Sequence, residues 1–412
     1  MSFNRINNLV GWIVTLIACS VYIMTAEAGG SLWDCGEFVS SCFKIQIPHP
    51  PGAPLFVLLG RVFIILFGDN PLTAAKAVNV MSALASGFTI MFLFWTITHF
   101  ARKIVQKNND ALSGSQIFTI MSAGVVGALA YTFSDSFWFS AVEGEVYALS
   151  SFFTALVFWM MLKWEHSADE PGADKWIVLI FFMMGLSIGV HLLNLLTIPA
   201  IVMIYYYKRY KPTNWGIFYA FIIGCIITGV AQKVVIQYTI KTAGSFDIFF
   251  VNTLGLPFFT GFALYFLILG ALIFFGIKIA GNKNIGRNQF GIWVGLIAIA
   301  ILYPFISSGS GGSVLVKLIL ILAAVALTTV YGLPALQKNP YFLRLSMWCF
   351  AFMLIGYSTY LTTLIRSAAN PAIDMYNVDN PMSLEGYLGR EQYGDFPLLY
   401  LSLIHISEPT RH

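Results

Sequence analysis

Charged residues are scarce in this sequence. Of 412 residues, only 10% are charged, whereas 58% are hydrophobic. An ordinary soluble domain carries roughly 25% charged residues, and a soluble chain of this length could not bury so much apolar surface. The composition therefore excludes a soluble globular protein and predicts that lipid surrounds most of the chain.

Cysteines and nucleotide-binding motifs are scarce as well. The five cysteines are scattered, without the spacing of a metal site. Cys35 and Cys42 share one segment, so they could form a disulfide in an oxidising compartment or remain free thiols.

The sequence has no P-loop and no Gly-rich dinucleotide turn, which disfavours direct use of a nucleotide-activated substrate. No nucleic-acid partner is expected.

Long apolar runs predict an all-α integral membrane protein with about eleven transmembrane helices, because roughly 20 apolar residues are needed to cross a bilayer. The fifth and sixth runs are short and nearly continuous, which predicts a tight helical hairpin. The expected spans are Leu9–Ala26, Ala77–Phe100, Gln116–Phe133, Val146–Trp164, Trp176–Val190, Leu192–Tyr207, Trp215–Tyr238, Leu256–Ile277, Phe290–Ile306, Val314–Leu333 and Leu345–Ile365.

The positions of the charges predict an orientation in the membrane. Leu55–Phe67 is apolar but short, contains Arg61 and follows a Pro-rich turn. If this segment lies on the outer surface instead of crossing, Arg102, Lys103 and Lys107 fall on the cytoplasmic side, as the positive-inside rule requires. We therefore expect a cytoplasmic amino terminus and an acidic outer side.

The chain is expected to consist of three parts. Residues 1–366 form a polytopic transmembrane domain, in which residues 27–76 are the first outer loop and further outer loops fall at Ser134–Glu145 and Lys241–Gly255. Residues 367–400 begin an external carboxyl-terminal region that we expect to be truncated. The run LSLIHISEPTR within residues 401–412 matches the translation of a transposase sequencing adapter, so we expect this tail to be foreign to the fold.

The first outer loop carries an acidic pair. Asp34 and Glu37 are three residues apart, so a helical turn would place both on one face. A carboxylate at the membrane surface costs desolvation energy unless it has a partner or a task. The pair is either solvated or part of a fixed, half-buried site. We favour a fixed site, because Trp33 and Phe38 flank the pair and prolines surround His49.

Four other charged residues are candidates. Glu143 and Glu145 lie on either side of a glycine in the second outer loop, so they could face one cavity or cap the next helix. Lys233 and Lys317 lie near the ends of apolar runs. Cations in such positions indicate a function, unless the side chain simply extends to the surface.

Several ordered motifs resemble one family of membrane enzymes. They are WDCGEF, PHPPGAPLF, AVEGEVYALSSFF, GLSIGVHLLNLL and NPMSLEGYLGREQYGD. An acidic pair soon after the first helix, followed by His-Pro-Pro before a surface helix, resembles the GT-C superfamily of membrane glycosyltransferases. Within it, nearly all of residues 1–400 are similar to a bacterial family, common in Bacteroidetes and long described as a domain of unknown function, that is grouped with protein O-mannosyltransferases.

This resemblance implies a GT-C-like fold and the transfer of a sugar, typically mannose, from a polyprenyl-phosphate carrier to an acceptor. The acceptor is expected to be a protein Ser/Thr hydroxyl, or else a glycan, at the periplasmic face of the inner membrane. The lipid-linked sugar is then a substrate, and no separate cofactor is expected. The resemblance points to metal-independent chemistry, although a divalent metal on Asp34 and Glu37 stays an alternative.

The expected chemistry assigns roles to the candidates. A phosphate leaving group needs no general acid, so one carboxylate suffices to take the proton of the acceptor hydroxyl. We expect Asp34 to be this base and Glu37 to orient its neighbours. Glu145, and Glu143 beside it, are expected to shape the sugar or acceptor site. His49 is expected to contact substrate, or only to belong to the proline turn.

The phosphate of the carrier requires a cation or dipole. His191 stands where related enzymes often carry a lysine at the phosphate, so the resemblance implies a phosphate-binding role. The alternative is a histidine that is hydrogen-bonded inside the bundle. Lys233 and Lys317 are the other candidates for this site.

Two other functions share these features. A secondary transporter would place its charges near the bilayer midplane, whereas the carboxylates here concentrate on one side of the membrane. A ligase or polymerase of lipid-linked polysaccharides would use the same carrier. We therefore favour a glycosyltransferase and keep both alternatives.

Overall fold

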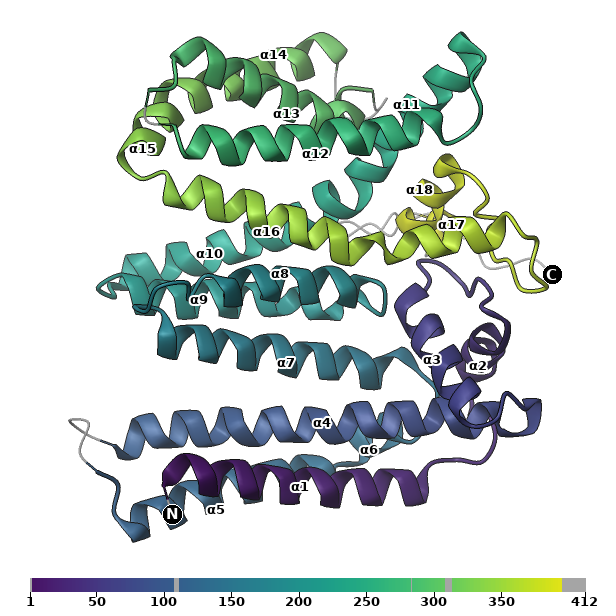
Figure 1. Ribbon diagram of the computed structural model, residues 1–412, viewed down its shortest axis with the longest axis vertical. Coiled ribbons are helices and arrows are strands. Elements are labelled where there is room, and N and C mark those ends of the chain that lie inside the picture. The colour runs from purple at the N-terminus through teal and green to yellow at the C-terminus, as the bar shows by residue number, and fades with distance from the viewer. Residues whose placement is uncertain (1, 107–110, 283, 308–312, 395–412) are drawn as a thin grey trace, which may run out of the picture.

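The computed structural model describes residues 2–106, 111–282, 284–307 and 313–394. Most helices lie side by side along a common direction, and the longest axis of the molecule runs across them (Figure 1). Ile47 and Asp374 form an isolated β-bridge between two loops. Residues 401–412, the expected adapter-derived tail, lie outside the described residues, as do Lys107 and the end of the 367–400 region.

The first half of the chain contains the helices that surround the first outer loop. Their bounds are α1 Phe3–Thr25, α2 Cys35–Lys44, α3 Pro54–Leu66, α4 Pro71–Val105, α5 Gly114–Thr132, α6 Asp135–Ala141, α7 Val146–Ser167, α8 Lys175–Ile188, the 3₁₀ turn η1 Leu192–Thr197 and α9 Ile198–Arg209.

The second half adds the remaining long helices and two short ones after them. They are α10 Asn214–Val230, η2 Ala231–Tyr238, α11 Thr239–Leu254, α12 Thr260–Ala280, α13 Arg287–Ser307, α14 Val314–Leu327, η3 Thr328–Gly332, α15 Leu333–Lys338, α16 Tyr341–Tyr357, η4 Ser358–Tyr360, α17 Leu361–Ser367, α18 Pro381–Gly389 and η5 Glu391–Tyr393.

Nine helices or continuous helical runs within the described residues are long and apolar enough to cross a membrane. This confirms an all-α integral membrane protein. The two other predicted spans correspond to the short helices α8 and α9, of 14 and 12 residues. Near the end of α9, Lys208 pairs with Asp169 and Arg209 donates to the carbonyl of Ala168. The chain therefore returns to the start of α8, as the predicted hairpin requires.

One predicted loop is a helix instead. The segment Lys241–Gly255 was expected outside the membrane, but α10, η2 and α11 continue as one helical run to Leu254. Asp247 is the acidic residue of this segment. Its buried carboxylate accepts hydrogen bonds from the backbone N–H groups of Phe259 and Gly261, at 3.1 Å each. It thereby supplies acceptors for N–H groups at the start of α12, which have no partner within the helix.

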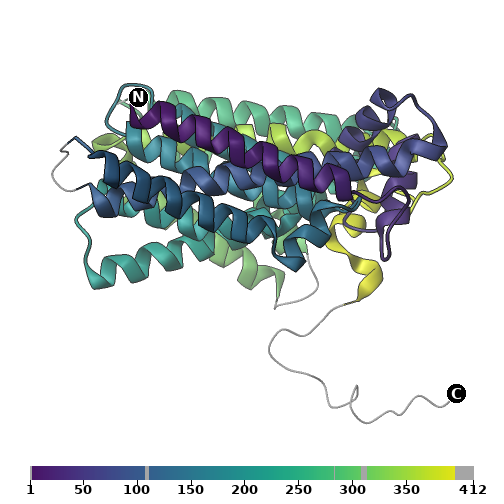
Figure 2. The ribbon, with the colours of Figure 1, turned by 90° about the horizontal axis from the view of Figure 1, so that it is seen from below.

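Helices α2, α3 and α18 gather at one end of the bundle (Figures 1 and 2). With 13 residues, α3 is about 20 Å long and too short to cross a bilayer by itself. Arg61 joins it to its surroundings, because its guanidinium donates to the carbonyl of Phe43 and pairs with Asp69. We call α2, α3 and residues 366–394 the cap.

The two parts of the cap are joined by backbone hydrogen bonds. Ile47 donates to the carbonyl of Ile373 at 3.0 Å, and Met375 donates to the carbonyl of Ile47 at 3.1 Å. Arg366 donates to the carbonyl of Ile45 at 2.8 Å. The described part of the predicted external region therefore packs on the first outer loop.

Candidate functional site

Helix α2 positions the acidic pair. Asp34 immediately precedes the helix and its carbonyl accepts the first helical bond from Phe38, while Glu37 lies in the first turn. Phe38 and Cys42 are buried on the inner side of α2. The Asp34 side chain is 58% exposed and that of Glu37 is 25% exposed. Asp34 is therefore open to an incoming substrate, and Glu37 is half-buried behind it.

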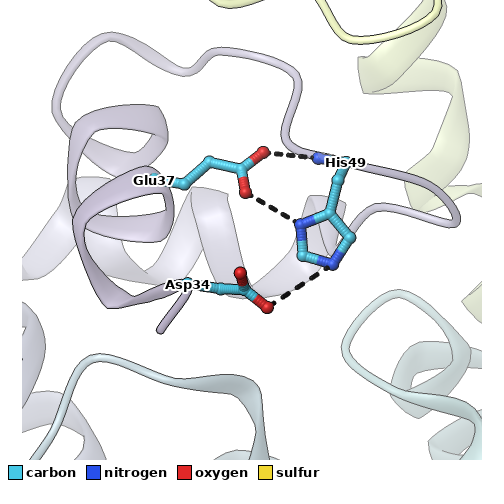
Figure 3. Close-up of side chains that lie close together, drawn as sticks. All are labelled: Asp34, Glu37 and His49. Carbon is cyan, nitrogen blue, oxygen red and sulfur yellow. Dashed lines mark hydrogen bonds and ion pairs between the residues drawn. The ribbon is translucent and has the colours of Figure 1, made fainter. Parts of the chain in front are cut away.

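His49 lies between the two carboxylates (Figure 3). Glu37 accepts two hydrogen bonds from this residue, one from its backbone N–H at 2.6 Å and one from Nδ1 at 2.8 Å. The other ring nitrogen, Nε2, lies 3.9 Å from Oδ2 of Asp34, which is too long for a direct hydrogen bond. Glu37 thus fixes the ring so that Nε2 faces Asp34.

These contacts favour opposite charges on Glu37 and His49. The hydrogen bond to Glu37 raises the pKa of His49 above its ordinary value, against the opposing effect of burial. Burial disfavours the Glu37 anion, but the hydrogen bonds from His49 outweigh it and lower the pKa of Glu37. Asp34 therefore faces an imidazole whose protonated form is stabilised.

Two tyrosines from distant helices hold the turn that carries His49. The buried Tyr387 of α18 donates to the carbonyl of Pro48, and Tyr360 of η4 lies 3.3 Å from the carbonyl of Gly52. Gly52 has a φ of 72°, and a Cβ atom there would lie 2.2 Å from the Tyr387 hydroxyl. The carboxyl-terminal part of the cap therefore sets the position of His49.

A cluster of three buried groups begins with Cys35, the residue after Asp34. The Cys35 thiol is 3.6 Å from Oε2 of Glu143 and 3.9 Å from Oε1 of Glu145, and all three residues are buried. Glu145 also accepts a hydrogen bond from the backbone N–H of Val146 at the start of α7. Glu145 therefore caps a helix, which was one of the two predicted alternatives, and its side chain also adjoins Cys35.

The environment of Glu145 favours a proton. Burial, with the negative charges of Asp34 and Glu143, raises its pKa to about 7. Burial also raises the pKa of Glu143. Burial and the two carboxylates raise the pKa of Cys35, so its thiol stays neutral and can donate a hydrogen bond. The cluster thus holds a group that titrates near neutral pH, within the electrostatic range of Asp34.

His191 adjoins the cap through the loop after α8. Leu55 at the start of α3 donates to the carbonyl of Gly189 at 2.8 Å. Nδ1 of His191 accepts a hydrogen bond from the backbone N–H of Leu193, and the ring packs 5.6 Å from that of Tyr147. Burial lowers its pKa. The neutral ring therefore caps η1, which leaves Nε2–H available as a donor.

Arg390 is a site residue that the sequence did not indicate. It follows α18, three residues after Tyr387, and its charge disfavours the protonated forms of both His49 and His191. Its guanidinium lies 4.9 Å from the Tyr393 ring. No local pattern relates it to either histidine, because only the docking of α18 on the first outer loop brings them together.

The two predicted lysines lie elsewhere. Lys233 is exposed in η2 and donates to Gln237 at 2.7 Å. Lys317 is buried on α14, 5.5 Å from the Phe305 ring, and α14 packs against α13 and η3. The structure thus gathers Asp34, Glu37, His49, Glu143, Glu145 and His191 around the cap, and leaves both lysines in other helices.

Asp34, Glu37 and His49 also offer donor atoms for a cation. One ligand atom from each lies within 4.8 Å of the other two, and carboxylate with imidazole suits a divalent metal. Both oxygens of Glu37 already accept hydrogen bonds from His49. A bound metal would therefore use Asp34 and Nε2 of His49, with Glu37 orienting the ring from behind.

Cys35 and Cys42 do not form the disulfide that one interpretation allowed. Both are free thiols buried in α2. Cys35 faces Glu143 and Glu145, whereas Cys42 lies 3.9 Å from the carbonyl of Phe56 in α3. They pack against different elements, and this separates them.

Comparisons with known proteins agree with the resemblance seen in the sequence. Residues 34–214 match a family model described as the Protein O-mannosyl-transferase TMEM260 N-terminal domain. This part of the chain is protein O-mannosyltransferase-like. The matched segment begins at Asp34 and contains Glu37, His49, Glu143, Glu145 and His191, whereas Lys233, Lys317 and Arg390 lie beyond it.

Two curated relatives carry the same description. The chain is 26% identical over 149 residues to Protein O-mannosyl-transferase tmem260 of Dictyostelium discoideum, which covers 36% of this chain and 16% of that protein. It is 28% identical over 169 residues to Protein O-mannosyl-transferase TMEM260 of Mus musculus, which covers 41% of this chain and 21% of that protein. The match thus spans about a fifth of these relatives or less. No solved structure matches the chain.

Proposed function

We propose that this protein transfers a sugar, mannose by analogy with the names of its relatives, from a polyprenyl-phosphate carrier to a protein hydroxyl. One observation carries the proposal. The matched segment places an exposed carboxylate, Asp34, beside a histidine that Glu37 holds through two hydrogen bonds. The cluster lies at one end of the helix bundle (Figures 1 and 3), which favours an enzyme over a transporter with a midplane site.

The proposed reaction has a simple proton balance. The acceptor hydroxyl oxygen attacks the anomeric carbon while the bond from that carbon to the phosphate oxygen breaks. Asp34 takes the hydroxyl proton, and the polyprenyl phosphate leaves with the bonding electrons and without a proton. One general base is therefore sufficient, because the leaving phosphate is already a stable anion.

We assign His49 as a positioning residue for this base. Its protonated form is stabilised by Glu37, and Nε2 faces Asp34 at 3.9 Å. A positive charge at this distance attracts the Asp34 carboxylate and so favours one orientation of its oxygens. Glu37 therefore acts through His49.

The departing phosphate is expected to bind on the side of His191 and Arg390. His191 offers Nε2–H, and Arg390 supplies a permanent charge that affects both histidines. Donors and cations aimed at a developing phosphate charge stabilise the transition state. Lys233 and Lys317 become weaker candidates, since their helices do not belong to the cap.

The periplasmic face of the inner membrane is the proposed location of the site. Cationic side chains lie at the opposite end of the bundle, where Lys103 pairs with Glu165 and Arg209 pairs with Asp169. By the positive-inside rule, that end is cytoplasmic. The bacterial source and this orientation both stay predictions.

A reconstituted transfer assay tests the proposed function. The full chain in detergent or liposomes is given labelled polyprenyl-phosphate mannose and a Ser/Thr-rich peptide. Label should move to peptide hydroxyls, a nucleotide-linked mannose should not replace the donor, and EDTA should not abolish transfer. A folded chain that moves no sugar would contradict the proposal, and loss of activity in EDTA restored by a divalent cation would support the metal alternative instead.

A further inference from the structure

A pocket with charged and apolar lining lies at the end of the bundle opposite the cap. It has a volume of about 270 Å³ and is lined by the first residues of α8 and α16, among them Lys175 and Arg344. These two helices pack side by side, and both begin at this end (Figure 1). Asp174, just before α8, accepts a hydrogen bond of 2.5 Å from the Tyr341 hydroxyl of α16, which joins the two starting ends.

The pocket is positively charged. It contains the exposed cations Lys175 and Arg344 against the half-buried carboxylate of Asp174. The starting ends of α8 and α16 add partial positive charge, because the amide dipoles of both helices point the same way. An anion would therefore be attracted to this opening.

The wall of the pocket is apolar one helical turn further along each helix. Val178 follows Lys175 by three residues, so the two share one face of α8. Leu345 and Trp348 continue the lining on α16, and the Trp348 side chain is 43% exposed. Trp is typical of the membrane–water interface. A cationic opening above an apolar, Trp-lined wall matches a molecule with an anionic head and an acyl chain.

We infer that this pocket binds the headgroup phosphate of an acidic membrane phospholipid. Lys175 and Arg344 contact the phosphate, and an acyl chain lies along Val178, Leu345 and Trp348. The apolar wall favours a lipid over a soluble anion, because the pocket opens where the candidate span Tyr341–Ser367 and the apolar helix α8 begin. This inference does not depend on the proposed function, since the pocket and the cap lie at opposite ends of the bundle.

Lipid titration of the purified full chain tests the inference. Binding of phosphatidylglycerol and phosphatidylcholine is measured by native mass spectrometry in neutral detergent. The parent chain should prefer phosphatidylglycerol. The double variant Lys175→Gln, Arg344→Gln should bind it about 25-fold more weakly, since each cation near an anionic headgroup adds about a fivefold preference. Phosphatidylcholine binding should not change.

Two further variants keep the test interpretable. Lys211→Gln removes an exposed cation at the same end but outside the pocket, and it should leave the preference unchanged. Arg344→Lys retains the charge and should retain most of the affinity. A loss of affinity in the glutamine variant but not in the lysine variant is then due to the charge and not to a disturbed fold. Unchanged selectivity in a folded double variant would overturn the inference. So would displacement of the lipid by millimolar inorganic phosphate, or tighter binding of polyprenyl phosphate than of phosphatidylglycerol.

Discussion

At the scale of single residues, the central contact is the pair of hydrogen bonds from His49 to Glu37. A carboxylate that accepts both a backbone N–H and a ring N–H fixes the orientation of the imidazole and stabilises its charge. Asp34 makes no such contact and keeps its oxygens available. The two carboxylates of one helical turn therefore have different tasks, because only Glu37 lies within hydrogen-bond distance of His49.

The variant Glu37→Gln tests this division of tasks. The pKa of His49 should fall toward its ordinary value, so the imidazolium is lost at a lower pH. The alkaline limb of the pH profile of kcat should then move to lower pH, with about a tenfold loss of kcat near pH 8. Glu391→Gln changes an exposed carboxylate that accepts from Tyr376 and serves as the control. A profile that stays in place would show that Glu37 does not act through His49.

The buried Glu145 predicts a pH-dependent stability. Its pKa is about 7 in the folded chain, against 4.5 for a free group, so the folded state holds the proton more tightly. Stability should therefore fall as pH rises from about 4.5 to about 7 and stay low above it. Glu145→Gln should increase the free energy of unfolding at pH 8 by up to about 3 kcal/mol, and Tm should rise accordingly. At pH 5 the same substitution should change Tm little.

Thermal unfolding of both proteins across this pH range checks the prediction for Glu145. Glu170→Gln, which removes an exposed carboxylate in the loop before α8, should reproduce the parent curve. Equal Tm shifts for Glu145→Gln at pH 5 and pH 8 would contradict the prediction, because they would mean that the carboxyl group does not titrate between these pH values in the folded chain.

At the scale of elements, the cap depends on α18. Its Tyr387 hydroxyl donates to the carbonyl of Pro48, and its chain continues to Arg390, whose charge acts on both histidines. The helices of the bundle followed from the length and apolarity of their segments, since lipid permits few other structures. The α18 contacts could not be predicted, because they join residues far apart in sequence through a loop whose path no local pattern determines.

Replacing Tyr387 by Phe removes this contact without changing the ring. The carbonyl of Pro48 then loses a buried donor, which costs about 1–3 kcal/mol in stability. We expect kcat to fall several-fold because the His49 turn is less firmly held, while the helical content measured by circular dichroism stays constant. Tyr393→Phe, in the more exposed η5, should behave like the parent. Full activity of Tyr387→Phe would show that α18 does not position His49.

At the scale of the whole molecule, two groups of charged side chains lie at opposite ends of the bundle. The cap carries the acidic cluster, and the opposite end carries ion pairs of Lys103, Lys208 and Arg209. The sequence predicted this separation from the positive-inside rule, together with the spacing of Asp34 and Glu37. It did not predict the approach of His49 to both carboxylates or the burial of Cys35 against Glu143 and Glu145, because both depend on tertiary packing.

Cysteine labelling tests the orientation that follows from α3 lying at the surface. In a background without reactive native thiols, Asp69→Cys should react with an impermeant reagent from the periplasmic side. Glu170→Cys, at the other end of the bundle, should react only after the membrane is permeabilised. The reverse pattern would mean that α3 crosses the membrane or that the chain has the opposite orientation.

The central claim is that Asp34 is the base of a sugar transfer, and the variant Asp34→Asn tests it most directly. The amide keeps the shape of the side chain and removes its basicity. Transfer from polyprenyl-phosphate mannose should drop by roughly 10²-fold or more, with donor binding preserved. Asp69→Asn, which removes another exposed carboxylate of the first outer loop, should transfer sugar at close to the parent rate. Near-normal transfer by a folded Asp34→Asn protein would contradict the account.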